Sequence, residues 1–292
     1  MIARTDRVAR ILLAALVSLL CAAAAAQPAP TPGPQSQDGA RRQGKFIWFE
    51  LVTDNPEAAR AFYPPVFGWS FRPVPGAPAS YALIENGGDR VGGMFVQPRK
   101  DGVTRASRWL PVLSVSDAAA AARYAAQNGG SIVAPVATIP GRGTHALLRD
   151  SEGALFGVLR TERGDPADTP VEDGDFFWLD LLAKDPPRAA AFYRGLAGYH
   201  VGEREGPSGG NRLVLESQGF ARGGVLPLPP GLAQSGWLPY VLVSDVAATL
   251  AKVAAAGGRV LVQPDPALLD GKLAVIADPG GGVLGIVDWE RQ

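Results

Sequence analysis

Residues 46–51 read FIWFEL, and a closely similar stretch, FFWLDL, occupies residues 176–181, 130 positions further on. Each stretch is followed at the same distance by Ala-Phe-Tyr, at 61–63 and at 191–193. Motifs that recur together at a fixed spacing indicate an internal duplication. A second pair of motifs supports this, because WLPV at 109–112 returns as WLPY at 237–240, after 128 positions.

We therefore predict two homologous modules, at residues 44–162 and 173–292. The linker between them, residues 163–172, is rich in proline and aspartate, which is typical of a connecting segment.

Each module is predicted to contain the same small unit twice. Alternating apolar residues predict a strand over 45–53, and Asp54-Asn55-Pro56 is typical of a helix start before an alanine-rich helix at about 57–62. Pro and Gly residues separate three short strands that follow, at 69–72, 80–85 and 90–96. The second half repeats the order, with a strand at 109–115, a helix at 117–127 ended by Gly129-Gly130, and three further strands. The sequence thus predicts four βαβββ motifs and an α+β fold.

The first residues have the pattern of an export signal. Arg4, Arg7 and Arg10 precede an apolar run, and Ala24-Ala25-Ala26 has the small-residue form that signal peptidases accept. We expect residues 1–26 to be a signal peptide cleaved near Ala26-Gln27, residues 27–43 to be a disordered tether, and the mature protein to be periplasmic. No later apolar run approaches membrane length, so we expect no membrane contact after cleavage.

The overall composition excludes several classes of protein. The chain has 292 residues with 28 Lys+Arg against 28 Asp+Glu, so it carries no broad basic field for nucleic acid. Its one cysteine cannot form an internal disulfide.

The ordered motifs resemble those of the glyoxalase and bleomycin-resistance group, also called the vicinal oxygen chelate (VOC) superfamily. The resemblance rests on the first-strand W-[F/L]-[E/D]-L pattern, the A-x-x-F-Y helix, W-L-P-[V/Y], the Gly-Gly helix end and D-[S/P]-x-G, and it covers nearly all of residues 44–290. It implies two tandem modules whose mixed sheets are cup-shaped, with a metal or a ligand on the concave face.

The resemblance also implies where metal ligands would stand, and the residues there are unsuited to the role. The positions that correspond to the family ligands are Trp48, Gly93, Leu110 or Pro111, and Gly157 in the first module, and Trp178, Gly224, Leu238 or Pro239, and Gly285 in the second. Transition metals need converging N, O or S donors, which these side chains lack. We predict no metal and no cofactor.

Strand alternation predicts that Phe46, Trp48 and Glu50 lie on one face of the first strand, which the resemblance identifies as the inside of the cup. Asp180 stands beside Trp178 in the same way. A carboxylate beside an indole could hold a cation or amine, or act as a base. Alternatively, the two tryptophans fill the cups as core residues, and the acids bond to the backbone or to an arginine such as Arg90 or Arg222.

The remaining candidates occur in one module only. Tyr240 has Val112 as its counterpart, which predicts that the two cups differ. His145 is a lone histidine on a predicted strand, and it could act as an acid or base if it faces the cup. The candidate site residues are therefore Trp48, Glu50, Trp178, Asp180 and Tyr240 for a ligand, and Glu50, Asp180 and His145 for catalysis.

These features predict a metal-free exported protein that binds a small aromatic or cationic molecule in an aromatic-lined cup. The alternative is a VOC-type lyase, isomerase or dioxygenase with a non-standard metal or acid/base site. A third reading is a duplicated scaffold that binds another protein. Four motifs in one chain fit either a monomer or a homodimer.

Overall fold

The computed structural model describes residues 34, 36, 38–74, 77, 80–97, 105–205 and 211–289. The predicted signal peptide at 1–26, and most of the predicted tether at 27–43, lie outside these residues. In the part of the chain described, no helix has the length and apolar character needed to cross a membrane.

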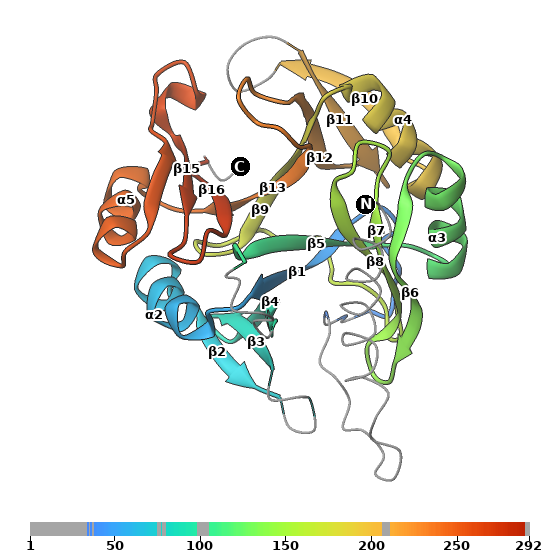
Figure 1. The fold of residues 1–292 in the computed structure, drawn as a ribbon, viewed down its shortest axis with the longest axis horizontal. Helices are drawn as coiled ribbons and strands as arrows, with labels where there is room; N and C mark the ends of the chain where they lie inside the picture. Colours follow the sequence, from blue (N-terminus) through green and yellow to red (C-terminus); the bar gives the residue numbers. More distant parts are fainter. Residues whose placement is uncertain are drawn as a thin grey trace, which may run out of the picture.

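The first module is one mixed sheet of eight strands (Figure 1), in the order β2-β3-β4-β1-β5-β8-β7-β6. β1 pairs parallel with β4 and antiparallel with β5, which joins the two βαβββ units edge to edge. The elements are β1 (Phe46–Thr53), α2 (Pro56–Phe67), β2 (Ser70–Pro73), β3 (Tyr81–Asn86), β4 (Asp89–Val96), β5 (Arg108–Ser114), α3 (Ala118–Gln127), β6 (Ser131–Ile139), β7 (Gly143–Arg149) and β8 (Leu155–Thr161).

The second module repeats this topology in the order β10-β11-β12-β9-β13-β16-β15-β14. Its elements are β9 (Phe176–Ala183), α4 (Pro186–Ala197), β10 (His200–Glu205), β11 (Asn211–Ser217), β12 (Phe220–Pro227), β13 (Gly236–Leu242), α5 (Val246–Ala255), β14 (Arg259–Val262), the short 3₁₀ helix η1 (Leu269–Gly271), β15 (Leu273–Ala277) and β16 (Val283–Val287). The prediction of an α+β fold made of four βαβββ motifs is confirmed.

The first helix of each module begins and ends for the same local reasons. In α2 the Asn55 side chain accepts a hydrogen bond from Ala58 N, and the helix ends at Gly68, which has φ +77°. The predicted end at about residue 62 was too early. Pro64 and Pro65 lie inside the last turns, where the buried Val66 and Phe67 hold the helix against the core.

The two modules share one large hydrophobic core. It contains helix residues and one face of each sheet, including Phe49, Leu51 and Leu113 from the first module and Leu181 and Val241 from the second. Figure 1 shows α2 beside α5 and α3 beside α4, so each module's helices meet those of the other. The opposite face of each sheet carries a smaller core of its own, and these two faces are called the first cup and the second cup below.

A matched set of hydrogen bonds ties the two modules together. Tyr63 on α2 donates to Asp278 Oδ2 at 2.7 Å and accepts from Trp109 Nε1 at 3.0 Å. The arrangement is repeated in the opposite direction. Tyr193 of the second module donates to Asp150 Oδ2 of the first at 3.0 Å, and it accepts from Trp237 Nε1 at 2.9 Å. Each aspartate also accepts backbone N–H bonds within its own turn, as expected for an Asx turn.

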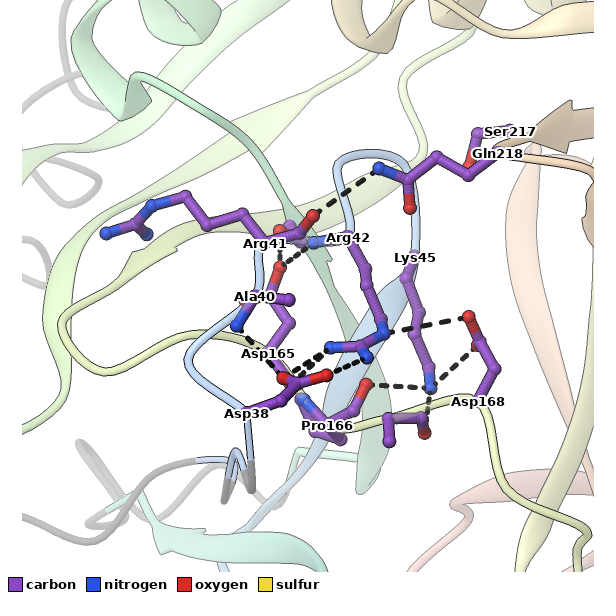
Figure 2. A network of polar contacts seen from close by, with 12 residues as sticks. Asp38, Ala40, Arg41, Arg42, Lys45, Asp165, Pro166, Asp168, Ser217 and Gln218 are labelled. Carbon is purple, nitrogen blue, oxygen red and sulfur yellow. Dashed lines mark hydrogen bonds and ion pairs between the residues drawn. The ribbon is translucent and has the colours of Figure 1, made fainter.

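Residues 38–43, the part of the predicted tether next to β1, bond to neighbouring parts of the chain. Figure 2 shows that Asp38 forms an ion pair with Arg42, whose backbone N–H donates to Asp165 of the linker at 2.5 Å. Lys45 reaches Asp168 at 3.0 Å, and Arg222 of the second module bonds to the same carboxylate. Arg42 therefore anchors residues 38–43 to the linker, and Arg41 bonds to Thr161 at the end of β8.

Candidate functional site

A β-bulge at the start of β1 decides which side chains enter the first cup. The β1–β5 pairing slips between Phe46 and Trp48, so that Phe46 faces the shared core and its ring lies 4.9 Å from that of Trp237. Ile47 and Trp48 both face the cup, and Glu50 follows on the same side. The predicted grouping of Phe46 with Trp48 and Glu50 is wrong for Phe46, because simple alternation does not cross a bulge.

Trp48 fills the floor of the first cup. It is 1% exposed and packs with Leu83, Val112 and Leu159. A side chain buried to this degree contributes packing energy whatever else it does.

Glu50 lies in a charged group that the sequence did not identify. Its Oε1 accepts from Arg142 Nη2 at 2.7 Å and from Tyr81 OH at 3.2 Å. Arg142 comes from the β6–β7 connection, and its guanidinium carbon stands 5.5 Å from the centre of a Trp48 ring. The alternative in which the acid meets an arginine therefore holds for Glu50, with Arg142 as the arginine, whereas Arg222 pairs with Asp168. A local sequence pattern could not have found Arg142, which is distant in the chain and reaches the cup through a hairpin.

Three polar atoms of the first cup are buried without a hydrogen-bond partner among the described residues: Trp48 Nε1, Glu50 Oε2 and His145 Nε2. His145 pairs across the sheet with Leu159, which places it on the cup face. Burial and the nearby Arg142 lower the pKa of His145 to about 4, so it is neutral at pH 7. The structure thus brings three of the predicted site residues to the cup face of one sheet, where a buried donor and a buried acceptor lack partners among the described residues.

The second cup contains the same chemical groups, with the tryptophan and the carboxylate on the equivalent strand, β9, and the phenol and the guanidinium on different elements. Trp178 donates from Nε1 to Asp180 Oδ1 at 2.8 Å, and Tyr240 of β13 stands against the same carboxyl. Arg212 of β11 lies over Trp178 with 5.0 Å from its guanidinium carbon to a ring centre. Burial raises the pKa of Asp180, which is 2% exposed.

Glycines stand where the resemblance would place two of the metal ligands in each module, and neighbouring side chains occupy the space above them. A Cβ on Gly93 would lie 2.5 Å from Glu50 Oε2, and one on Gly285 would lie 2.0 Å from the ring of Tyr240. No group of three or more His, Cys, Asp or Glu side chains suited to a metal occurs among the described residues. These residues do not fit a metal of the family type.

A cavity of about 1310 Å³ lies beside both cups, along the linker. Ile47 and Arg142 of the first cup border it, as do Phe177 and Trp178 of the second. Of the candidate site residues Trp48, Glu50, His145 and Trp178, the one that borders this cavity is Trp178.

Comparisons with known proteins agree with the fold. Residues 45–87 match the family described as bleomycin resistance protein-like N-terminal, and residues 177–287 match the glyoxalase-like domain. CFP32 of Mycobacterium tuberculosis, a protein named only provisionally as a glyoxylase, is 31% identical over 248 residues, which cover 84% of this chain and 95% of that protein.

Two more distant proteins extend the comparison. The anthracycline biosynthesis protein DauV of a Streptomyces species is 25% identical over 84% of this chain and 93% of its own. The Mn(II)-bound glyoxalase from Novosphingobium aromaticivorans has the same fold, with a TM-score of 0.56 and 17% identity over 86% of each chain. With two matching domains and a relative of this similarity along most of its length, the chain belongs to the glyoxalase and bleomycin-resistance group, the VOC superfamily.

Proposed function

We propose that this protein is an exported binding protein that holds a small aromatic molecule, with a polar substituent, in the first cup. The observation that carries the proposal is the set of three buried polar atoms, Trp48 Nε1, Glu50 Oε2 and His145 Nε2, that lack partners among the described residues. Each such atom destabilises the closed cup by about 1–3 kcal/mol, and a ligand that supplied the missing partners would regain this energy.

The electrostatics of the first cup favour a neutral ligand over a cationic one. Arg142 already pairs with Glu50 and already occupies the position over the Trp48 ring that a ligand cation would take. The free atoms instead suit a polar group that donates to Glu50 Oε2 and accepts from Trp48 Nε1. An aromatic ring fits the apolar wall of Trp48, Leu83 and Val112. DauV supports this choice, since anthracyclines are aromatic compounds.

A thermal-shift and calorimetry screen of small aromatic amides, phenols and anilines tests the proposal. Trp48→Phe keeps an aromatic ring, although a smaller one, and removes the N–H, so it should weaken binding of a hit by about tenfold. Trp178→Phe is the matched control, because it makes the same change in the second cup. Equal binding by the wild type and Trp48→Phe would contradict the proposal.

A second candidate function is catalysis by acid and base groups in the same cup. The specific observation is that His145, neutral at pH 7, and Glu50 each present an unpartnered atom to one surface. The resemblance to CFP32 and to the Mn(II)-bound glyoxalase makes a glyoxalase assay, with and without added Mn(II), the direct test. Turnover that is abolished by His145→Gln would establish this candidate, and no turnover under either condition would remove it.

Export is part of the proposal and has its own test. Residues 1–26 carry the charge pattern and the small-residue site of a signal peptide. Expression of the full chain in a Gram-negative host should give a periplasmic protein whose N-terminal residue is Gln27. Recovery of the intact N-terminus from the cytoplasm would contradict export.

A further inference from the structure

The two cups contain the same four kinds of side chain, although the strands that supply two of them differ. Both have a tryptophan and a carboxylate at corresponding positions, Trp48 and Glu50 in the first cup and Trp178 and Asp180 in the second. In the first cup β3 supplies the phenol, Tyr81, and the β6–β7 connection supplies the guanidinium, Arg142.

The second cup obtains the phenol and the guanidinium from other places. Leu83 pairs with Gly93, and Val214 pairs with the equivalent glycine, Gly224, so Leu83 and Val214 are equivalent. Tyr81 and Arg212 each stand two residues before them. Arg212 therefore occupies the position that Tyr81 has in the first module. Tyr240 lies opposite Trp178 as Val112 lies opposite Trp48, so the phenol comes from β13. In both cups the arginine ends over the indole ring, at 5.5 Å and 5.0 Å.

The hydrogen bonds left open differ between the cups. In the first cup the indole N–H and one carboxylate oxygen are free among the described residues, so both a donor and an acceptor are available. In the second cup the indole N–H is already bonded to Asp180. The buried polar atom there that lacks a partner among the described residues is Arg212 Nε, and a guanidinium nitrogen can only donate.

We propose that the second cup is a separate binding site, selective for an aromatic molecule whose polar group only accepts a hydrogen bond, as a ketone does. Arg212 Nε donates to the carbonyl oxygen, and the ring enters from the cavity that Phe177 and Trp178 border. The expectation that the two cups prefer different ligands rests on the proposed function of the first cup. The binding of a carbonyl group by Arg212 in the second cup does not depend on it.

Acetophenone and benzamide are suitable probes, because they share a phenyl ring and a carbonyl and differ in the amide N–H donors. Binding can be followed by NMR of protein labelled with ¹⁵N-tryptophan, with the indole resonances assigned from Trp48→Phe and Trp178→Phe. We expect acetophenone to shift the Trp178 resonance and benzamide to shift that of Trp48.

Arg212→Lys keeps the charge and removes Nε, and it should weaken acetophenone binding by roughly tenfold, while benzamide binding at Trp48 changes less than about twofold. Arg212→Tyr, which copies the first module, is a second variant in case the lysine disturbs the fold. Acetophenone binding that is unchanged in both variants, or absent from the wild type at millimolar concentration, would overturn the inference. If acetophenone behaves as expected and no amide, phenol or aniline of the screen shifts the Trp48 resonance, the proposed function fails and the second site stands.

Discussion

Trp48 and Trp178 occupy the same position in their modules and yet differ in burial. Trp48 is 1% exposed with a free N–H, whereas Trp178 is partly exposed, borders the cavity and is bonded to Asp180. The difference follows from the partners of each carboxylate. In the first cup Glu50 accepts from Arg142 and Tyr81, whereas in the second cup Asp180 accepts from its own indole, with Tyr240 and Arg212 beside it.

Truncation of these two residues should therefore have unequal effects on stability. Trp48→Ala should lower the free energy of unfolding by about 3–5 kcal/mol, since it leaves a large hole among Leu83, Val112 and Leu159. Trp178→Ala should lower it by less, because part of its ring already faces solvent. Urea unfolding followed by circular dichroism measures both values. If the two variants lost the same free energy of unfolding, the difference in burial between Trp48 and Trp178 would not affect stability.

His145 gives the first module a defined pH response. Its pKa is about 4 in the folded protein and near 6.5 when unfolded, so the unfolded chain binds the proton more tightly. Stability is therefore full above pH 6.5 and falls as the pH drops from 6.5 toward 4, by up to about 3 kcal/mol.

The matched control for this prediction is His145→Leu, because Leu273 occupies the same position in the second module. The variant should lack the histidine contribution and so lose less stability between pH 7 and pH 4 than the wild type does. Urea unfolding at several pH values gives the comparison, and parallel curves for the two proteins would refute the pKa assignment.

At the scale of strands, the last strand of each module has a glycine that faces the cup, and the two glycines differ in how closely a neighbouring side chain approaches them. Gly157 on β8 and Gly285 on β16 are equivalent positions. Gly157 pairs with Val112 of the parallel strand β5, and Gly285 pairs with Tyr240 of the parallel strand β13. A Cβ on Gly157 would lie 3.1 Å from a Val112 methyl group, but one on Gly285 would lie 2.0 Å from the Tyr240 ring.

Gly285→Ala should accordingly destabilise the protein by about 1–3 kcal/mol or more, and Gly157→Ala by less than about 1 kcal/mol. In a Tyr240→Val background the second cup copies the first, so Gly285→Ala should there become nearly neutral. Thermal unfolding of the four proteins completes the cycle. If Gly285→Ala remained costly after Tyr240→Val, the clash would lie with another group.

The elements also show what could be predicted from the sequence. Strands, helices and their order follow from the duplicated motifs, the capping residue Asn55 and the Gly-Gly helix ends, all of which are local signals. The bulge that turns Phe46 away from the cup was missed, because a one-residue slip leaves no mark in an alternating pattern. The continuation of α2 through Pro64 and Pro65 was missed because packing of Val66 and Phe67 outweighs a proline penalty.

The candidate site was predictable in part. Trp48 and Glu50 could be placed in a cup because the resemblance identified the strand, and His145 was recognised as a candidate if it faced inward. Arg142, Tyr81 and Arg212 were not found, since nothing local to them distinguishes a cup residue from a surface one. Their role depends on which hairpin folds over which strand, and that is a property of the tertiary structure.

At the scale of the whole molecule, the two modules are linked too closely to behave as independent domains. One core includes residues of both, and Tyr63 and Tyr193 each bond an aspartate of the other module. Burial raises the pKa of both Asp150 and Asp278, so each carboxyl depends on its tyrosine and on the backbone N–H groups of its turn.

Loss of either tyrosine hydroxyl should therefore weaken the whole molecule rather than one half. Tyr63→Phe leaves Trp109 Nε1 and Asp278 Oδ2 without that partner, and Tyr193→Phe does the same to Trp237 and Asp150, so each should lower the free energy of unfolding by about 1–3 kcal/mol. Because the shared core unfolds with both modules, each variant should still show one transition, with the same midpoint by tryptophan fluorescence and by circular dichroism. Two separated transitions in either variant would mean that the modules fold independently, and that the crossed bonds join two stable halves.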